Sequence, residues 1–175
     1  MLSFIKAYKK FDPAAKSSLE IALLYPGVRA VVLHRAAHWL YGLRLYFLAR
    51  AVSEFARTTT GTEIHPGAQL GKHVIIEHGF GVVIGETAIV GNNVIILQGV
   101  VLGVRDAVRS HAGRRHPTIG DGAILCSGAK ILGPIHVGRG ARIGANAVVL
   151  SDIPDHATAV GIPAVIVSCK LKAAA

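Results

Sequence analysis

The sequence predicts a mainly β fold, a parallel β-helix of hexapeptide repeats preceded by an α-helical N-terminal segment. Three observations carry this prediction. An aliphatic residue returns every six positions from Ile64 onward, a glycine often follows it, and the residues before 58 show helical spacing instead. The repeating positions are Ile64, Leu70, Ile76, Val82, Ile84, Val90, Ile96, Leu102, Ile119, Leu125, Ile131, Val137, Ile143 and Val149.

A six-residue period is typical of a parallel β-helix, because each repeat can bury its apolar face only by stacking on its neighbours. The glycines of Leu70-Gly71 and Val90-Gly91 suit corners that need a positive φ or a close backbone approach. A β-sandwich is the alternative, but its strands would alternate every two residues and its turns would be irregularly spaced. The observed period favours the β-helix.

Residues 1–57 are predicted to be helical. Asp12 is an N-cap candidate before Pro13, and apolar residues follow at helical spacing through Tyr25. Pro26-Gly27 ends this helix, and a second helix is predicted over residues 28–57. Its apolar face comprises Val32, Leu33, Ala36, Trp39, Leu40, Leu43 and Phe47. Residues 58–175 then form the β-helix domain, with residues 58–61 as the hinge.

His34 and His38 lie one helical turn apart, which is also zinc-ligand spacing. The sequence offers no third ligand nearby, so a structural role is favoured over a metal site. The two cysteines, Cys126 and Cys169, form no disulfide framework and lack metal-binding spacing.

The charge and hydropathy patterns narrow the possible partners. The formal net charge is +9 over 175 residues, but the basic residues are scattered and Phe80 is the only aromatic residue after Phe55. A nucleic-acid platform is therefore not expected, whereas a ligand with several phosphates suits this charge. Charged residues interrupt the apolar stretch 21–51, and residues 1–10 lack the apolar core of a secretory signal. We expect a soluble cytoplasmic protein with no membrane segment.

Two irregularities in the repeat predict the functional region. From Leu102 to Ile119 the interval is 17 residues where six would continue the coil, so about 11 residues must leave it as a loop within residues 103–118. Near Glu77-His78 the phase slips by two residues. This segment lies two repeats after Glu63, so a coil of about three repeats is expected to bring the two close on adjacent levels. A histidine beside carboxylates is the arrangement for general-base catalysis.

Motifs along nearly the whole chain resemble those of the short bacterial serine O-acetyltransferases. The motifs are Asp12-Pro-Ala-Ala, His38-Trp-Leu, Glu63-Ile-His-Pro-Gly-Ala, Glu77-His-Gly-Phe-Gly-Val-Val-Ile-Gly-Glu-Thr-Ala, Gln98-Gly-Val-Val-Leu-Gly, Arg115-His-Pro-Thr-Ile-Gly-Asp, Gly128-Ala-Lys-Ile-Leu-Gly-Pro-Ile and Gly144-Ala-Asn-Ala-Val-Val-Leu. The resemblance implies a left-handed β-helix, homotrimers that often pair into hexamers, and active sites between neighbouring subunits. It also implies acetyl-CoA as co-substrate, no metal, and synthesis of O-acetylserine for cysteine biosynthesis.

The resemblance also implies roles for individual residues. His78 matches the catalytic general base, which takes the proton of the serine hydroxyl, and Glu63 matches the acid that orients it. Asp12 and Glu77 match the residues that hold the serine ammonium. The remaining matches are Arg115 for the substrate carboxylate, His116 in the substrate pocket, and Gly103, Ser127 and Ala145 for coenzyme A.

The chain departs from the family pattern at several of these positions. The usual Asp-His-Gly is Glu77-His78-Gly79, and Gly103-Val104-Arg105-Asp106 replaces a Gly-Gly-Thr-Gly run in a loop about three residues longer. Ser127 replaces a usual alanine, and Pro163-Ala164-Val165 lacks a usual basic residue. A paralogous acetyltransferase for another small amino acid, amino alcohol or sugar therefore stays open as the alternative.

A second alternative class is the γ-class carbonic anhydrase, which would need three histidines converging on zinc between subunits. The candidate ligands are His65, His73, His78, His111 and His116, but their local motifs follow the transferase pattern. Relatives in the transferase family often bind O-acetylserine sulfhydrylase through a C-terminal isoleucine. This sequence ends in Ala175, so we expect no such complex. Cysteine feedback inhibition is expected only if serine is the substrate.

Overall fold

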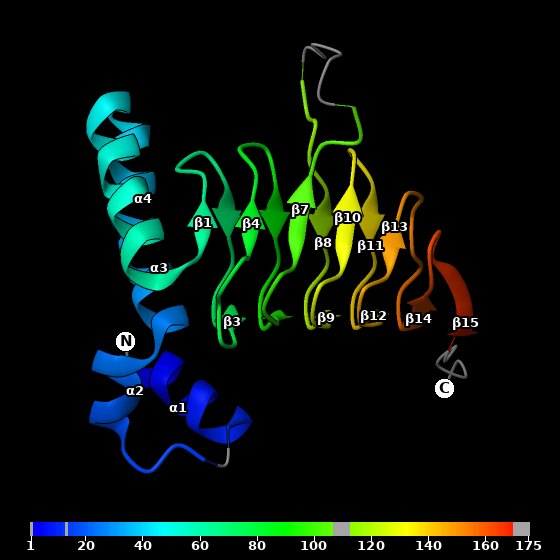
Figure 1. Cartoon of the computed structure of the whole chain (residues 1–175), viewed down its shortest axis with the longest axis horizontal. Helices are drawn as coiled ribbons and strands as arrows, with labels where there is room; N and C mark the ends of the chain where they lie inside the picture. The colour runs from blue at the N-terminus through cyan, green and yellow to red at the C-terminus, as the bar shows by residue number, and fades with distance from the viewer. Residues whose placement is uncertain (1, 13, 107–112, 170–175) are drawn as a thin grey trace.

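Four helices and a parallel β-helix make up the computed structural model, which describes residues 2–12, 14–106 and 113–169. The helices are α1 (Leu2–Phe11), α2 (Ser18–Leu24), α3 (Pro26–Gly42) and α4 (Tyr46–Thr60). They gather at one end of the molecule, and the coil extends away from them toward the C-terminus (Figure 1).

The strands of the coil form three sheets. The first sheet holds β1 (Glu63–Ile64), β4 (Val83–Ile84), β7 (Val101–Gly103), β10 (Lys130–Leu132) and β13 (Val148–Val149). The second holds β2 (Gln69–Leu70), β5 (Ile89–Val90), β8 (Thr118–Ile119) and β11 (His136–Val137). The third holds β3 (Ile75–Ile76), β6 (Ile95–Ile96), β9 (Ile124–Leu125), β12 (Arg142–Ile143), β14 (Ala157–Val160) and the antiparallel β15 (Val165–Cys169).

The strand register confirms both predicted irregularities. Ile64 pairs with Ile84, which leaves room for the two extra residues near His78. Leu102 of β7 pairs with Ile131 of β10, its ordinary partner one coil on, so the extra residues between β7 and β8 leave the coil as the predicted loop (Figure 1). Residues 107–112 of this loop, including His111, lie outside the described residues, as do residues 170–175.

The repeating aliphatic residues form the core of the coil. All of them are buried except Leu70, which is partly buried against the same cluster. The predicted corner glycines are explained by close approach: a Cβ on Gly71 would lie 2.5 Å from the carbonyl oxygen of Gly91 on the next coil. Ala30 and Val31 of α3 join this core and close the end of the coil that faces the helices.

The predicted N-cap at Asp12 is wrong. Asp12 follows α1, and helix α2 begins later because Ser17 caps it: the Ser17 hydroxyl accepts a hydrogen bond from the Glu20 N–H, and the Glu20 carboxylate accepts one from the Ser17 N–H. This reciprocal capping box satisfies two backbone donors at once. Pro26 then occupies the first turn of α3, where its fixed φ is favourable.

The single helix predicted over residues 28–57 is also wrong. The chain breaks between α3 and α4 at Arg44, which adopts a φ of 62°, and the two helices pack side by side. The buried side of α3 comprises Gly27, Val28, Ala30, Val31, His34 and Ala37. The predicted apolar face instead points outward, with Trp39 and Phe47 65% and 84% exposed. Within the described residues, no helix has the length and apolar character needed to cross a membrane.

His34 lies in the core between α3 and the first coil. Its ring stacks on His38 at 5.7 Å, and the Nδ1 of His38 lies 2.7 Å from the carbonyl oxygen of Pro66. Burial, with a smaller contribution from His38, lowers the pKa of His34 to about 4. The other groups that face this ring are Arg35 and the backbone of His65 and Ala68.

We expect His34→Leu to remove part of the acid sensitivity of folding. The folded chain keeps His34 neutral, while the unfolded chain protonates it below pH 6.5. The free energy of unfolding is therefore unaffected by this group above pH 6.5 and falls as the pH decreases toward 4. The loss is on the order of 3 kcal/mol. Urea unfolding at pH 7 and pH 4.5 measures it, with the exposed His136→Leu as the control. An unchanged pH dependence in His34→Leu would contradict the expectation.

Candidate active site

The first group of predicted site residues forms the acidic cluster, defined here as Asp12, Glu77 and His78. Glu77 directly follows β3, and His78 lies in the turn from β3 to β4 with a φ of 59°. The His78 side chain is 73% exposed, and its Nε2 lies 4.0 Å from the Glu77 carboxylate. Asp12 comes from the end of α1 and interacts electrostatically with both other members. The fold thus brings Asp12 close to the adjacent residues Glu77 and His78, as predicted.

The two carboxyl groups of the acidic cluster differ in their environment. The hydrogen bond from Tyr25 is the main cause that lowers the pKa of Asp12. Burial raises the pKa of Glu77, and Asp12 raises it further, whereas His78 opposes the shift. Because like charges disfavour each other, this pair of carboxylates is suited to a cation bound between them.

The second group forms the arginine cluster, defined here as Glu86, Thr87, Arg115 and His116. The Arg115 guanidinium pairs with Glu86 at 2.9 Å, and the backbone N–H of Arg115 and that of His116 donate to the Thr87 hydroxyl at 2.9 and 3.1 Å. The Nδ1 of the buried His116 accepts a hydrogen bond from the Thr87 N–H at 3.2 Å. These bonds hold the segment before β8 against the turn after β4.

The environment of the arginine cluster favours an ionised Glu86 and neutral imidazoles. Burial would raise the pKa of Glu86, but hydrogen bonds from Tyr41 and Arg115, together with nearby positive charge, outweigh it and lower the pKa. Burial lowers the pKa of His116, with Arg115 adding to the shift, and burial also lowers the pKa of His65. Arg115 keeps part of its side chain accessible, which leaves its planar donors available for a carboxylate.

Glu63 lies near the arginine cluster rather than at the His78 ring. Its carboxylate is 3.9 Å from Arg50 of α4 and interacts with His65. The two backbone segments are close, as predicted, since the Thr62 hydroxyl donates to the Gly79 carbonyl at 2.9 Å. Strand pairing, however, sets Glu63 opposite Val83. Within a single chain, Glu63 thus interacts with Arg50 and His65, whereas His78 interacts with Glu77 and Asp12.

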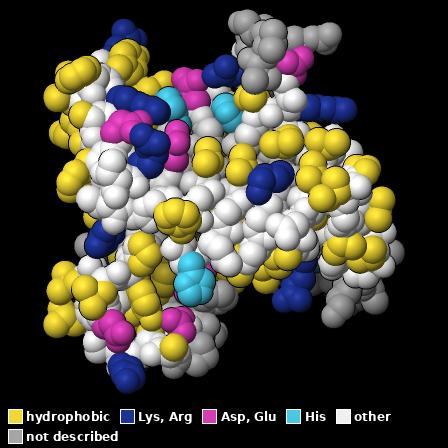
Figure 2. All heavy atoms as spheres, in the orientation of Figure 1, with side chains coloured by type: hydrophobic (Ala, Val, Ile, Leu, Met, Phe, Trp, Pro, Cys, Tyr) yellow, Lys and Arg dark blue, Asp and Glu magenta, His cyan; other side chains and the backbone are white. Residues whose placement is uncertain are grey.

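The acidic cluster and the arginine cluster lie on opposite edges of the first sheet. His78 occupies the corner that enters β4 from the third sheet, and Arg115 and His116 occupy the corner that leaves the first sheet for β8. In the face shown in Figure 2, histidines lie in two separate places, each beside acidic side chains.

Two of the predicted coenzyme residues continue the corner of His78 along the coil. Backbone hydrogen bonds connect its successive turns. The N–H groups of Gly99, Gly128 and Asn146 donate to the carbonyl oxygens of Phe80, Gln98 and Ser127, respectively. Ser127 and Ala145 belong to this corner, so they line up with His78. Gly103 lies elsewhere, at the base of the loop, where its carbonyl accepts a hydrogen bond from Gly133.

Gln98 adds an unsatisfied acceptor to the same corner. Its side-chain oxygen is buried and lacks a hydrogen-bond partner among the described residues. Because a buried acceptor without a donor is costly, this oxygen is suited to an N–H from a bound ligand. Nowhere in ranges 2–12, 14–106 and 113–169 do three or more His, Cys, Asp or Glu side chains gather closely enough to hold a metal ion.

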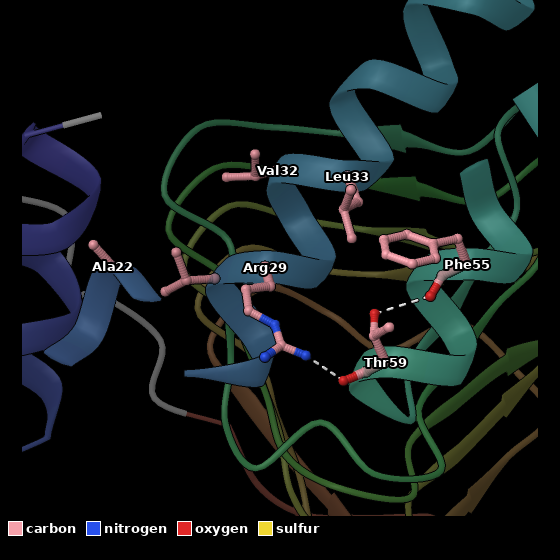
Figure 3. Close-up of a pocket in the computed structure, with 7 residues that line it drawn as sticks. Ala22, Arg29, Val32, Leu33, Phe55 and Thr59 are labelled. Carbon is pink, nitrogen blue, oxygen red and sulfur yellow. Dashed lines mark hydrogen bonds between the residues drawn. The ribbon is translucent and has the colours of Figure 1, made fainter. Parts of the chain in front are cut away.

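An apolar cavity of about 460 Å³ lies away from both clusters, between α2, α3 and α4 (Figure 3). Its lining includes Val32, Leu33 and Phe55, and the Arg29 guanidinium at its edge donates to the Thr59 carbonyl. Apart from Arg29 the lining carries no ionisable side chain, so the cavity supplies no acid or base for catalysis.

Several residues that shape the site were not predicted from the sequence. Glu86 and Thr87 follow the core position Ile84 and are stacked above the turn after Ile64, so an alignment of corner residues between coils would have indicated them. Tyr41 and Arg50 lie in helices, and Tyr25 lies between α2 and α3, so no repeat relates them to the coil. Only the tertiary structure could place them.

The chain is similar to known proteins in sequence and in fold. Residues 116–151 match the bacterial transferase hexapeptide family (six repeats). A serine acetyltransferase of Bacillus licheniformis is 55% identical over 152 residues, which cover 87% of this chain and 69% of the relative.

Two solved structures extend the comparison to the fold. A serine acetyltransferase of Neisseria gonorrhoeae superposes with a TM-score of 0.92 at 40% identity, covering 98% of this chain and 65% of that one. A serine acetyltransferase in complex with CoA superposes with a TM-score of 0.86 at 39% identity, covering 93% and 66%. This chain thus spans about two thirds of the length of these relatives, and the predicted left-handed parallel β-helix is confirmed.

Proposed function

The chain belongs to the serine acetyltransferase family of acyltransferases, and we propose that it transfers the acetyl group of acetyl-CoA to the hydroxyl of L-serine. The observation that carries this proposal is the pair of clusters with complementary chemistry. The acidic cluster suits an ammonium group, and the forked donors of Arg115 suit a carboxylate. Together they match the two charges of an amino acid.

In the proposed reaction, His78 acts as general base and the serine hydroxyl attacks the thioester directly. The imidazole takes the hydroxyl proton as the oxygen bonds to the acetyl carbonyl carbon. The tetrahedral intermediate then collapses, the carbon–sulfur bond breaks, and the imidazolium returns its proton to the departing thiolate. Atoms and charges balance without a covalent enzyme intermediate.

We propose that each active site is completed between two subunits of a homotrimer. Serine is too short to reach from one edge of the first sheet to the other, so one chain cannot offer it both clusters. A neighbouring subunit that sets its arginine cluster against the acidic cluster solves this problem. Glu63, which lies beside the arginine cluster, would then orient the His78 imidazole of its neighbour.

Acetyl-CoA is proposed to lie along the corner that carries His78, Ser127 and Ala145. The unpartnered Gln98 oxygen would accept an amide N–H of the pantetheine arm, and the small residues at the turns leave room for it. The net charge of +9 favours the phosphates of the co-substrate. Gly103, at the base of the loop, is the least aligned of the three predicted coenzyme residues. A cytoplasmic location belongs to the same proposal.

One observation favours a second candidate, an acetyltransferase for a different small hydroxylated acceptor. Glu77 stands where the family pattern has aspartate, and its longer side chain reduces the space next to His78. A change of that kind moves the ammonium site without removing the base.

Thiol release from acetyl-CoA tests both candidates. The purified protein is assayed with L-serine, homoserine, threonine, small hydroxylated amines and sugars, each at several concentrations. We expect the highest kcat/KM with L-serine. Thiol release with another acceptor but not with L-serine would support the second candidate. The absence of thiol release with every acceptor would contradict both candidates.

A further inference from the structure

Asp12 is held in place by two hydrogen bonds although it belongs to no helix or strand. The Tyr25 hydroxyl donates to Oδ2 at 2.6 Å, and the Ala14 N–H donates to Oδ1 at 2.8 Å. Each carboxylate oxygen therefore has one fixed donor and keeps further lone-pair capacity for a cation. Its own backbone N–H donates to the Tyr8 carbonyl at 2.8 Å.

Tyr25 is in turn anchored to the strand that leads to His78. Its ring stacks on Tyr8, with centroids 6.2 Å apart and planes at 25°. The buried Tyr8 hydroxyl accepts from the Ile76 N–H at 2.9 Å and donates to the Ile76 carbonyl at 3.1 Å. Because β3 is the edge strand of the third sheet, its outer backbone groups have no strand to pair with, and the Tyr8 hydroxyl satisfies those of Ile76. Glu77 and His78 follow directly.

We propose that Tyr25 is the positioning residue of the ammonium site, fixing the Asp12 carboxylate at a set place relative to Glu77 and His78. The inference rests on the proposed function, because it takes the ammonium of an amino acid as the ligand of Asp12. Tyr25 itself does not touch the reacting atoms. It acts through Asp12, and the stacked ring of Tyr8 ties both to the strand of the catalytic base.

The electrostatics of Asp12 supply a signature of this contact. The Tyr25 hydrogen bond is the largest cause of the lowered Asp12 pKa, followed by the Ala14 N–H, and the same contact raises the pKa of Tyr25 to about 12. The other charged groups that face this pair are Glu20, Glu77 and His78. Asp12 is ionised at pH 7 with or without Tyr25, so the effect on binding there is positional.

Tyr25→Phe removes the hydroxyl and keeps the ring. We expect the KM for L-serine to rise about tenfold, as for loss of one hydrogen bond to a charged group. The kcat and the KM for acetyl-CoA should stay within about twofold. Thr58→Val, which removes an exposed hydroxyl from α4, is the control and should leave all three parameters unchanged. In a chain that already carries Asp12→Asn, Tyr25→Phe should raise the KM for L-serine little further, because the two residues act as one unit.

A second readout does not depend on the acceptor. Carbon-13 titration of the aspartate carboxyls, with Asp12 assigned by its loss in Asp12→Asn, should show a higher Asp12 pKa in Tyr25→Phe than in the unmodified chain. An unchanged Asp12 titration, or a fall in kcat with an unchanged serine KM, would overturn the inference. If the unmodified protein does not acetylate serine, the proposed function fails, and the titration still decides whether Tyr25 positions Asp12.

Discussion

His78→Ala lowers the turnover of serine acetylation by about a hundredfold to ten-thousandfold, the range expected for loss of a general base. The physical reason is that the serine hydroxyl is a weak nucleophile until a positioned group takes its proton. The measurement is kcat from thiol release with both substrates saturating. Because His78 has a positive φ, His78→Asn is the better second variant: asparagine tolerates this backbone conformation and cannot act as the base.

The control for this prediction is an exposed histidine far from the site. His136→Ala on β11 should leave kcat unchanged. Size-exclusion chromatography and thermal unfolding should show the same oligomer for all variants, since the His78 side chain is 73% exposed and contributes little to the core. Near-normal turnover in both His78 variants would move the base elsewhere, with His116 as the next group to test.

Mixing two inactive variants restores activity if the sites form between subunits. We expect His78→Ala and Arg115→Ala each to lose most of the activity when assembled alone. After co-expression at equal levels, about a quarter of the sites should combine an intact His78 from one chain with an intact Arg115 from its neighbour, by random assembly in a symmetric ring. The restored rate should therefore approach a quarter of that of the unmodified protein.

The double variant serves as the control for the mixing experiment. When chains that carry both His78→Ala and Arg115→Ala are co-expressed with the unmodified chain, about a quarter of the sites stay intact if each site forms between two subunits. If one chain supplied both clusters, half of the sites would survive in that mixture, and the two single variants would restore nothing. The ratio of the two mixtures thus separates the two arrangements.

The coil and its two irregularities could be predicted from the sequence because each repeat is specified locally. An inward aliphatic residue every six positions leaves one way to bury it, and the long interval after Leu102 has to leave the coil. Glu77 and His78 were likewise indicated by polar residues that interrupt this pattern, whereas the role of Arg115 was implied by the resemblance to the family. The helices carry no such repeat, which is why the cap at Ser17 and the break at Arg44 were not predicted.

By itself, the sequence determined the β-helix and the loop after β7, since both follow from spacing along one strand path. The candidate site residues were implied by the resemblance of their motifs to the family. Only the tertiary structure decided how they group. Packing of α1 on β3 puts Asp12 beside His78, and packing of α4 on β1 puts Glu63 with Arg50 near Arg115. The physical reason is that corner positions depend on strand register and on helix packing, which couple residues far apart in the chain.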